Sequence, residues 1–268
     1  MKFLLLVGTF IYVIFIETSA EKRGNKEALL VIDVQNCFLP GGTLAVKGGE
    51  ELIPIINQLR QKFEIVAFTR DWHPKNHVSF ASMHQGLEPF DEINLDYDEN
   101  GKLCKSPTTN ISEKVCEENE VKYKVKQQVF GDHCIMDTKD SELNSQLETK
   151  NSQDIFVNKG YNCEVDSYSA FVNNGGFENT KMEEELDKNQ IGKVYVVGIA
   201  LDYCVFYSAM DSQKLGYETF LVKDATRGIT SKGIEHAIDE MTKAGIKIIT
   251  SDTLMATGNT SLSSKKEL

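Results

Sequence analysis

The chain has 268 residues, of which 41% are hydrophobic, a size and composition compatible with one large globular domain. Its 40 acidic and 29 basic side chains give a formal net charge of −11. Because proteins bind nucleic acids through basic patches that neutralise phosphates, this charge argues against nucleic acid as a partner.

The first twenty residues differ from the rest of the chain. Lys2 is followed by an almost entirely apolar run over residues 3–16, and small residues lead to Ala20. This pattern is typical of a secretory signal peptide cleaved after Ala20, and the run is shorter than the roughly 20 residues that span a bilayer. We therefore expect no stable membrane anchor, with an uncleaved signal anchor as the alternative, and a mature chain, residues 21–268, that forms a single domain.

Other features of the sequence also suggest the secretory pathway. Glycosylation sequons begin at Asn110 and Asn259, and the chain ends in Lys-Lys-Glu-Leu, which is similar to a retention signal of the endoplasmic reticulum. Both a secreted protein and a lumenal one stay open. Six cysteines suit an oxidising compartment, and Cys104 and Cys116, close together in one polar stretch, are expected to form a disulfide.

Along the mature chain, strand and helix patterns alternate. Short apolar runs predict strands at residues 28–34, 65–68, 154–157, 194–199, 218–222 and 246–249. Helical spacing predicts helices at residues 50–63, 141–149, 180–188 and 234–244, and one that begins at Cys204. Residues 85–126 lack clear periodicity and are rich in polar side chains, so we expect an inserted loop or small lobe there. The alternation predicts an α/β fold, with a mostly parallel central sheet flanked by helices on both faces.

Four reactive side chains lie at or just past the ends of predicted strands: Asp33, Asp71, Lys159 and Cys204. Since the carboxyl ends of parallel strands share one edge of the sheet, we expect these residues to converge there. A cysteine at a helix start ionises more easily, Asp33 could exchange its proton, and Lys159 would favour both anions, which suits nucleophilic catalysis. The structural alternatives are a buried cysteine at a turn, a loop-capping aspartate and a surface lysine.

A metal site is a second prediction. Asp71 and His73 are separated by one residue, His77 follows closely, and His133 comes after the insertion. One aspartate and two histidines can hold a divalent ion and leave positions open for a substrate. A capping aspartate beside a loop histidine is the alternative.

These residues stand in segments that resemble the nicotinamidases of the isochorismatase-like cysteine hydrolase superfamily. The matching segments occur in the family's order and span nearly the whole mature chain: residues 30–36, 68–74, 133–134, 157–160, 168–171 and 197–205. The resemblance implies hydrolysis of nicotinamide to nicotinate and ammonia through a thioester on Cys204. It makes Asp33 the general base and acid and Lys159 the third member of a catalytic triad.

The resemblance also implies the surroundings of the reacting atoms. It implies a cis peptide between Ile199 and Ala200 and an oxyanion hole made by the N–H groups of Ala200 and Cys204. One divalent ion, zinc or a similar metal, would bind the pyridine nitrogen. Its ligands would be Asp71, His73 and His133, with His77 as a further candidate, and the ring would contact Phe38, Phe130 and Tyr168, with Gln35 beside the water shell of the metal.

Two positions depart from the family pattern. The histidine ligand usually follows a Trp-Pro pair, whereas His133 follows Phe130-Gly131-Asp132, and Cys37 stands where relatives usually carry an acidic residue. Cys37 could pair, oxidise or only pack, and Cys134 and Cys163 are left unassigned. Two other functions stay open: an amidohydrolase of the same fold that acts on another small amide, and a secreted nicotinamide-binding protein without turnover. Homo-oligomerisation is left open as well.

Overall fold

The computed structural model describes residues 23–106, 111–149 and 152–256. The signal-peptide pattern, the asparagines of both sequons and the Lys-Lys-Glu-Leu tail lie outside the described residues. Among the described residues, no helix is both long and apolar enough to cross a membrane.

The central element is a six-stranded parallel sheet, which confirms the predicted fold class. Its strand order is β5-β2-β1-β6-β7-β8. The strands are β1 (Lys26–Ile32), β2 (Ile65–Asp71), β5 (Ile155–Lys159), β6 (Ile191–Ile199), β7 (Glu218–Arg227) and β8 (Lys247–Ile249). Residues 28–32 of β1 are completely buried, because helices cover both faces of the sheet and both sets of alternating side chains pack against them.

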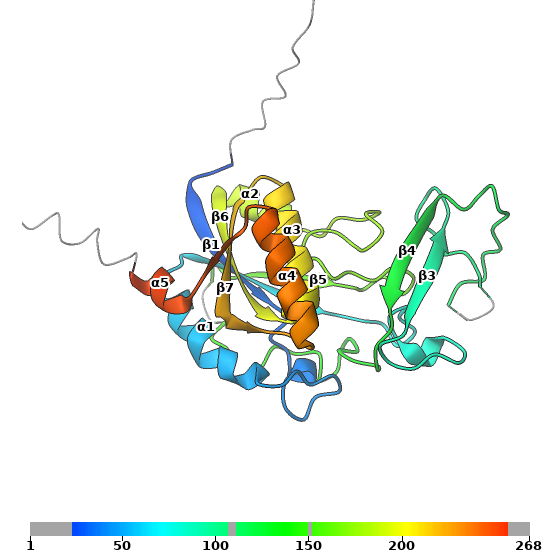
Figure 1. Cartoon of the computed structure of the whole chain (residues 1–268), viewed down its shortest axis with the longest axis horizontal. Helices are drawn as coiled ribbons and strands as arrows, with labels where there is room; N and C mark the ends of the chain where they lie inside the picture. Colours follow the sequence, from blue (N-terminus) through cyan, green and yellow to red (C-terminus); the bar gives the residue numbers. More distant parts are fainter. Residues whose placement is uncertain (1–22, 107–110, 150–151, 257–268) are drawn as a thin grey trace, which may run out of the picture.

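The helices form two layers around this sheet (Figure 1). On one face, α1 (Leu52–Arg60) and α5 (Ser251–Ala256) pack against side chains such as Leu29 and Val31. On the other face, α2 (Met182–Lys188), α3 (Phe206–Lys214) and α4 (Ser231–Lys243) pack against a cluster that contains Leu30 and Ile32. Alternate residues of β1 thus belong to two separate cores.

The strand order places the carboxyl ends of β1 and β6 beside each other at the centre of the sheet. From β1 the sheet extends in one direction through β2 to β5 and in the other direction through β6 to β7 and β8, so the order of the strands reverses between β1 and β6. Parallel sheets form a crevice at such a reversal, and ligands bind there. A π-helical turn, η4 (Leu201–Val205), follows β6 at this position and leads into α3.

The predicted insertion contains a second, smaller sheet. Strands β3 (Glu92–Tyr97) and β4 (Tyr123–Gln128) pair in antiparallel fashion and lie apart from the central sheet in Figure 1. Leu95, Tyr97 and Leu103 form a small core here with Val78 and Val165. The disulfide Cys104–Cys116 links the chain between the two strands, as predicted.

The predicted helix at residues 141–149 is wrong, because this segment forms turns. Side chains compete with the helical backbone there: the hydroxyl group of Ser141 donates to the carbonyl oxygen of Thr138, and Asn144 Oδ1 accepts from the backbone N–H of Gln146. Leu143 forms an isolated bridge with Gln35 instead.

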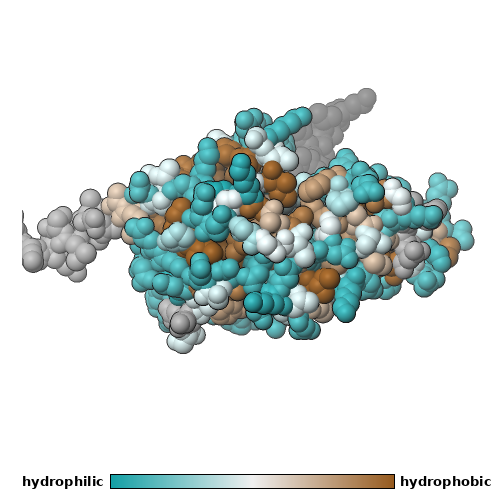
Figure 2. Space-filling view, turned by 90° about the horizontal axis from the view of Figure 1, so that it is seen from below, coloured by the Kyte–Doolittle hydropathy of each residue, from teal (hydrophilic) through white to brown (hydrophobic). Residues whose placement is uncertain are grey.

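The surface agrees with the polar, acidic composition. Figure 2 shows a face on which hydrophilic residues predominate and hydrophobic residues gather in several separate patches.

Candidate active site

Lys159 is the central residue of the site, and its side chain is completely buried. Its Nζ atom lies 2.9 Å from Asp33 Oδ2, 2.5 Å from Asp71 Oδ1 and 3.2 Å from Cys204 Sγ. The four residues come from the ends of β1, β2 and β5 and from η4, so the convergence predicted from the strand ends occurs. One cation therefore contacts two carboxylates and a thiol in a buried site.

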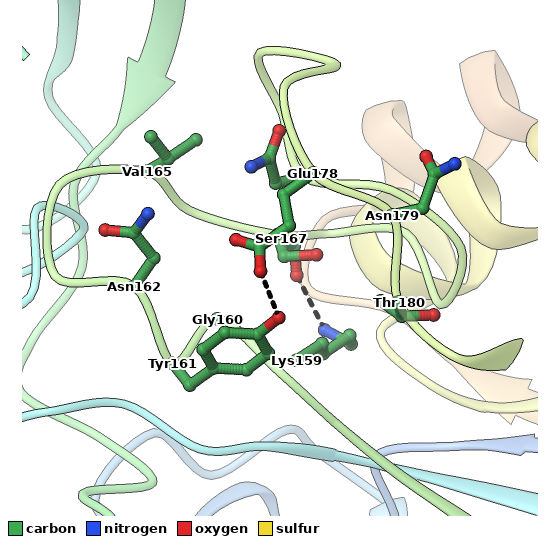
Figure 3. Close-up of a pocket in the computed structure, with 10 residues that line it drawn as sticks. Lys159, Gly160, Tyr161, Asn162, Val165, Ser167, Glu178, Asn179 and Thr180 are labelled. Atoms are coloured by element: carbon green, nitrogen blue, oxygen red, sulfur yellow. Dashed lines mark hydrogen bonds between the residues drawn. The ribbon is translucent and has the colours of Figure 1, made fainter. Parts of the chain in front are cut away.

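A loop on the outer side of β5 closes over this lysine. The carbonyl oxygen of Ser167 accepts a hydrogen bond of 2.9 Å from Lys159 Nζ, and the hydroxyl group of Tyr161 donates to Glu178. Figure 3 shows both bonds and the loop that carries them. The bond to Ser167 helps to fix the position of the ammonium group. Burial alone would lower the pKa of Lys159. Asp33 and Asp71 outweigh that effect and raise the pKa well above its usual value, so Lys159 stays charged.

The environment of Asp33 suits a proton acceptor. Burial raises the pKa of this carboxyl group to about 6, with Lys159 acting in the opposite direction. The hydroxyl group of Thr69 donates a hydrogen bond of 2.6 Å to Asp33 Oδ1, which leaves Oδ2 facing Lys159. A carboxylate with a pKa near neutrality can both take up and return a proton.

Cys204 is a thiol in this environment. Burial raises its pKa well above the usual value, although Lys159 opposes the shift. The sequence-based expectation that its position at the start of a helix favours the thiolate therefore describes only one of the influences on this residue. A neutral thiol needs a base before it can attack a substrate, and the carboxyl group bound to the same ammonium is the base at hand.

Three predicted metal ligands gather at one point. Asp71, His73 and His133 each offer a ligand atom, and these atoms lie within 4.8 Å of one another. The Nε2 atom of His73 lies 3.6 Å from Asp71 Oδ2, and the Nε2 atom of His133 lies 4.0 Å from the same oxygen. Burial raises the pKa of the Asp71 carboxyl group, but Lys159 and then His73 reverse this and lower it overall, so Asp71 is an anion.

The hydrogen bonds of both histidines fit metal binding. The Nδ1 atoms of His73 and His133 lie 2.8 Å from the carbonyl oxygens of Gly160 and Gly131, respectively. A carbonyl oxygen accepts only from a protonated nitrogen, so in the neutral form of each ring Nε2 is the nitrogen left to donate an electron pair to a metal. Burial also lowers the pKa of His133 to about 4, which keeps this ring neutral, as a ligand must be.

His77 lies beside these ligands, but the carboxylate near it is that of Asp166 and not that of Asp71. Its ring stacks on His73, with ring centroids 4.0 Å apart, and its Nδ1 atom contacts the Ser79 hydroxyl group. Its Nε2 atom is buried, has no hydrogen-bond partner among the described residues and lies 4.0 Å from Asp166. His73, His77 and Asp166 thus form a second buried group whose ligand atoms lie within 4.8 Å of one another, so the residues present fit a bound divalent ion and its surroundings.

A narrow pocket of about 370 Å³, mouth included, connects these groups. Of the predicted site residues, Asp71, His73, His133, Ala200 and Cys204 line it, together with all three predicted ring-contacting residues, Phe38, Phe130 and Tyr168. The peptide bond between Ile199 and Ala200 is cis. The thiol of Cys204, the predicted metal ligands and the aromatic walls thus line one cavity.

Gln35 contacts the backbone of Asp71. Its amide nitrogen donates to the carbonyl oxygens of Asp71 and Ser141, and its Oε1 accepts from the N–H of Asp71. The side chain therefore holds the backbone of a metal ligand.

Sequence reasoning missed several residues of the site. Thr69 and Tyr203 lie in matched segments and could have been found there, whereas the others carry no local signal: Leu44, Gln127, Asp166 and Ile229. Gln127 donates to Asp166 and to the hydroxyl group of Tyr168, so β4 supports the pocket.

Comparisons with known proteins agree with this geometry. The model of the isochorismatase domain matches residues 27–253. A nicotinamidase of Acinetobacter baylyi is 37% identical over 235 residues, which cover 87% of this chain and 97% of that protein.

Solved structures are similar over the same region. The yeast nicotinamidase Pnc1p, bound to the inhibitor nicotinaldehyde, has a TM-score of 0.72 at 31% identity, with 84% of this chain and 99% of that chain covered. The pyrazinamidase of Pyrococcus horikoshii, in complex with zinc, has a TM-score of 0.61 at 29% identity, with coverage of 84% and 99%.

Proposed function

The chain belongs to the isochorismatase family, and from this premise we propose that it is a nicotinamidase, which hydrolyses nicotinamide to nicotinate and ammonia. The observation that carries the proposal is the position of Lys159. Its ammonium group contacts the base, the nucleophile and a metal ligand, which joins the catalytic set to the metal cluster. A carboxamide on a pyridine ring fits this arrangement, because its amide can react with the catalytic residues while its ring nitrogen binds the metal.

The first half of the reaction transfers the acyl group to the enzyme. Asp33 takes the proton of Cys204, and the resulting thiolate forms a bond to the carboxamide carbon. The N–H groups of Ala200 and Cys204 are the proposed donors to the oxyanion. The carbon–nitrogen bond then breaks, and the leaving nitrogen receives the proton from Asp33 and departs as ammonia.

The second half releases the acid. Asp33 takes a proton from water, the hydroxide attacks the thioester carbon, and the carbon–sulfur bond breaks. The proton returns to Sγ of Cys204, nicotinate leaves, and Asp33 is ionised again. Lys159 holds Asp33 and Cys204 next to each other throughout and stabilises whichever of the two carries the negative charge.

A divalent ion held by Asp71, His73 and His133, for which we propose zinc, would bind the pyridine nitrogen and so orient the ring. The zinc complex of the Pyrococcus pyrazinamidase supports this choice. Phe38, Phe130 and Tyr168 would contact the ring faces and edges, which excludes water from the thiol.

The test is the release of ammonia and nicotinate from nicotinamide by the purified protein, with bound metal measured in the same sample. Benzamide is the matched control, because it presents the same carboxamide on a ring without nitrogen. We expect equal amounts of the two products from nicotinamide. The kcat/KM for benzamide should be lower by about 10²-fold or more, since its ring has no nitrogen that could bind the metal. Absence of turnover in a metal-loaded protein would instead favour another small amide or a role in binding alone.

The shifted pKa of Asp33 predicts the low-pH limb of the activity profile. Asp33 must be ionised to accept the thiol proton, and burial raises its pKa to about 6, so kcat/KM should fall as the pH drops below about 6. The hydrogen bond from Thr69 stabilises the ionised form, so Thr69→Val should move this limb to higher pH. Metal content measured across the same range separates protonation of Asp33 from metal loss. An unmoved limb in Thr69→Val would assign it to another group.

We also propose that the chain is made in the secretory pathway. The two disulfides of the structure support this, since such bonds persist in oxidising compartments. The N-terminal residue of the purified protein tests the proposal, because cleavage after Ala20 leaves Glu21 first and an intact leader would contradict it.

A further inference from the structure

We propose that the disulfide Cys37–Cys134 is a positioning element of the active site, which holds His133 and Phe38 at a fixed separation and thereby sets metal affinity and the KM for the substrate. This inference rests on the proposed function. It concerns two cysteines whose pairing could not be predicted from the sequence, one of them at a position that departs from the family pattern.

The bond joins two segments that each contribute a residue to the pocket wall. It connects residues 97 positions apart, and both cysteines are completely buried. Each is the direct neighbour of a pocket residue: Cys37 precedes Phe38, and Cys134 follows His133. Phe38 and His133 both line the pocket, and their rings are in contact, with centroids 5.7 Å apart. A change in the distance between the two cysteines would therefore change the distance between an aromatic wall and a metal ligand.

Backbone hydrogen bonds extend the effect to the second histidine. The carbonyl oxygen of Cys134 accepts a hydrogen bond of 3.1 Å from the N–H of His73, and that of Cys37 accepts one of 2.9 Å from Leu44, which also lines the pocket. The bridge is thus attached to both imidazole ligands, to one covalently and to the other through a hydrogen bond.

His133 needs such support because of where it lies. Asp71 is the last residue of β2, and His73 lies two positions further along the chain. His133, in contrast, belongs to residues 129–149, which form only turns and isolated bridges. Sites built on loops are less precise than sites built on regular elements unless something else fixes the loop. The disulfide provides a covalent constraint at the position of the ligand itself.

The second disulfide serves as an internal control. Cys104 and Cys116 are separated by 12 positions within the lobe, and neither they nor their sequence neighbours line the pocket. Removing it deletes the same chemical bond at a distance from the metal ligands. A general contribution of disulfides to stability would appear in both variants, while a positioning effect would appear in one.

The experiment compares Cys37→Ala/Cys134→Ala with Cys104→Ala/Cys116→Ala and the wild type. Zinc affinity of the metal-free proteins is measured by competition with a chelator, and kcat and KM are measured for nicotinamide after zinc loading. We expect the first variant to bind zinc about 10-fold to 100-fold more weakly, the range seen when the support of a metal ligand is lost. Its KM should rise more than its kcat falls, because Asp33, Lys159 and Cys204 do not depend on the bridge. The second variant should keep both constants.

Equal zinc affinity in the two variants would overturn the proposal, even if the first one melted at a lower temperature. If Cys37→Ala/Cys134→Ala does not fold, the folded Cys104→Ala/Cys116→Ala protein is reduced with a phosphine, desalted and titrated with zinc. A thiol assay confirms that Cys37–Cys134 is then open. Weaker zinc binding that recovers on reoxidation supports the positioning role, and unchanged binding excludes it.

The two proposals fail in different ways. Zinc affinity is measured without substrate, so a wild type that binds zinc but does not hydrolyse nicotinamide would contradict the proposed function alone. Normal turnover with equal zinc affinity in all proteins would contradict the positioning role alone.

Discussion

Cys204→Ala is expected to lower kcat for nicotinamide by about 10⁴-fold or more, because the variant lacks the atom that forms the thioester. Asp33 and Lys159 remain, but neither can replace Sγ in the step that breaks the amide bond. Affinity for nicotinamide should change little, since the aromatic walls and the metal ligands stay in place. Turnover and equilibrium binding, measured on the same preparation, separate the two effects.

Cys163→Ala is the matched control for this variant. Cys163 is the other free cysteine of the described residues, it is partly exposed, and it does not line the pocket, so its removal should leave kcat unchanged. An aldehyde in place of the amide adds a further check. The S–H group of Cys204 can add across its carbonyl, forming a carbon–sulfur bond and a hydroxyl group, and intact-protein mass should show one adduct in Cys163→Ala and none in Cys204→Ala. Turnover within about 10-fold of the wild type in Cys204→Ala would exclude the thioester route.

The central sheet could be predicted from the sequence because its strands are buried on both faces. Runs such as residues 28–32 are continuously apolar, and strand patterns of this kind alternate with helical ones along the chain. Once the sheet is parallel, the carboxyl ends of its strands share an edge. That rule alone brings Asp33, Asp71, Lys159 and Cys204 together without any knowledge of their partners.

The lobe itself was predicted as an insertion, but its strands were not, because they have only one weakly apolar face. In β3 and β4, exposed positions carry charge pairs across the strands, such as Lys124 with Asp96 and Lys126 with Glu92. The local composition is therefore polar, although Leu95 and Tyr97 are buried beneath. Sheets of this kind are stabilised by contacts between distant residues, which no single window of sequence contains.

The other features that could not be predicted are contacts between residues that are far apart in the sequence and close only in the folded chain. The pairing of Cys37 with Cys134, the approach of Asp166 to His77 and the support of Asp71 by Gln35 join segments separated by 36 to 97 positions. Spacing along the chain gives no signal for such contacts. The predicted helix at residues 141–149 failed for a local reason, since Ser141 and Asn144 bind the nearby backbone.

Lys159→Met is expected to abolish turnover and to destabilise the fold by about 3–5 kcal/mol, the usual cost of removing one partner of a buried ion pair. Methionine fills much of the same volume but leaves the carboxylates of Asp33 and Asp71 without their common cation. Both groups are buried, so the charge would remain in a medium of low dielectric constant. Denaturant unfolding and ammonia release measure the two consequences.

Arg60→Met separates the catalytic effect from the loss of stability. Arg60 forms a buried ion pair with Asp154 at 2.9 Å, outside the pocket, so this variant should lose stability and keep kcat. Adding Asp33→Asn to Lys159→Met removes one of the two orphaned charges. The double variant should therefore regain part of the lost stability but none of the activity, because the energies of groups in contact are not additive. If Lys159→Met alone were as stable as the wild type, water would have to reach the carboxylates, and the dry environment that raises the pKa of Asp33 would not exist in solution.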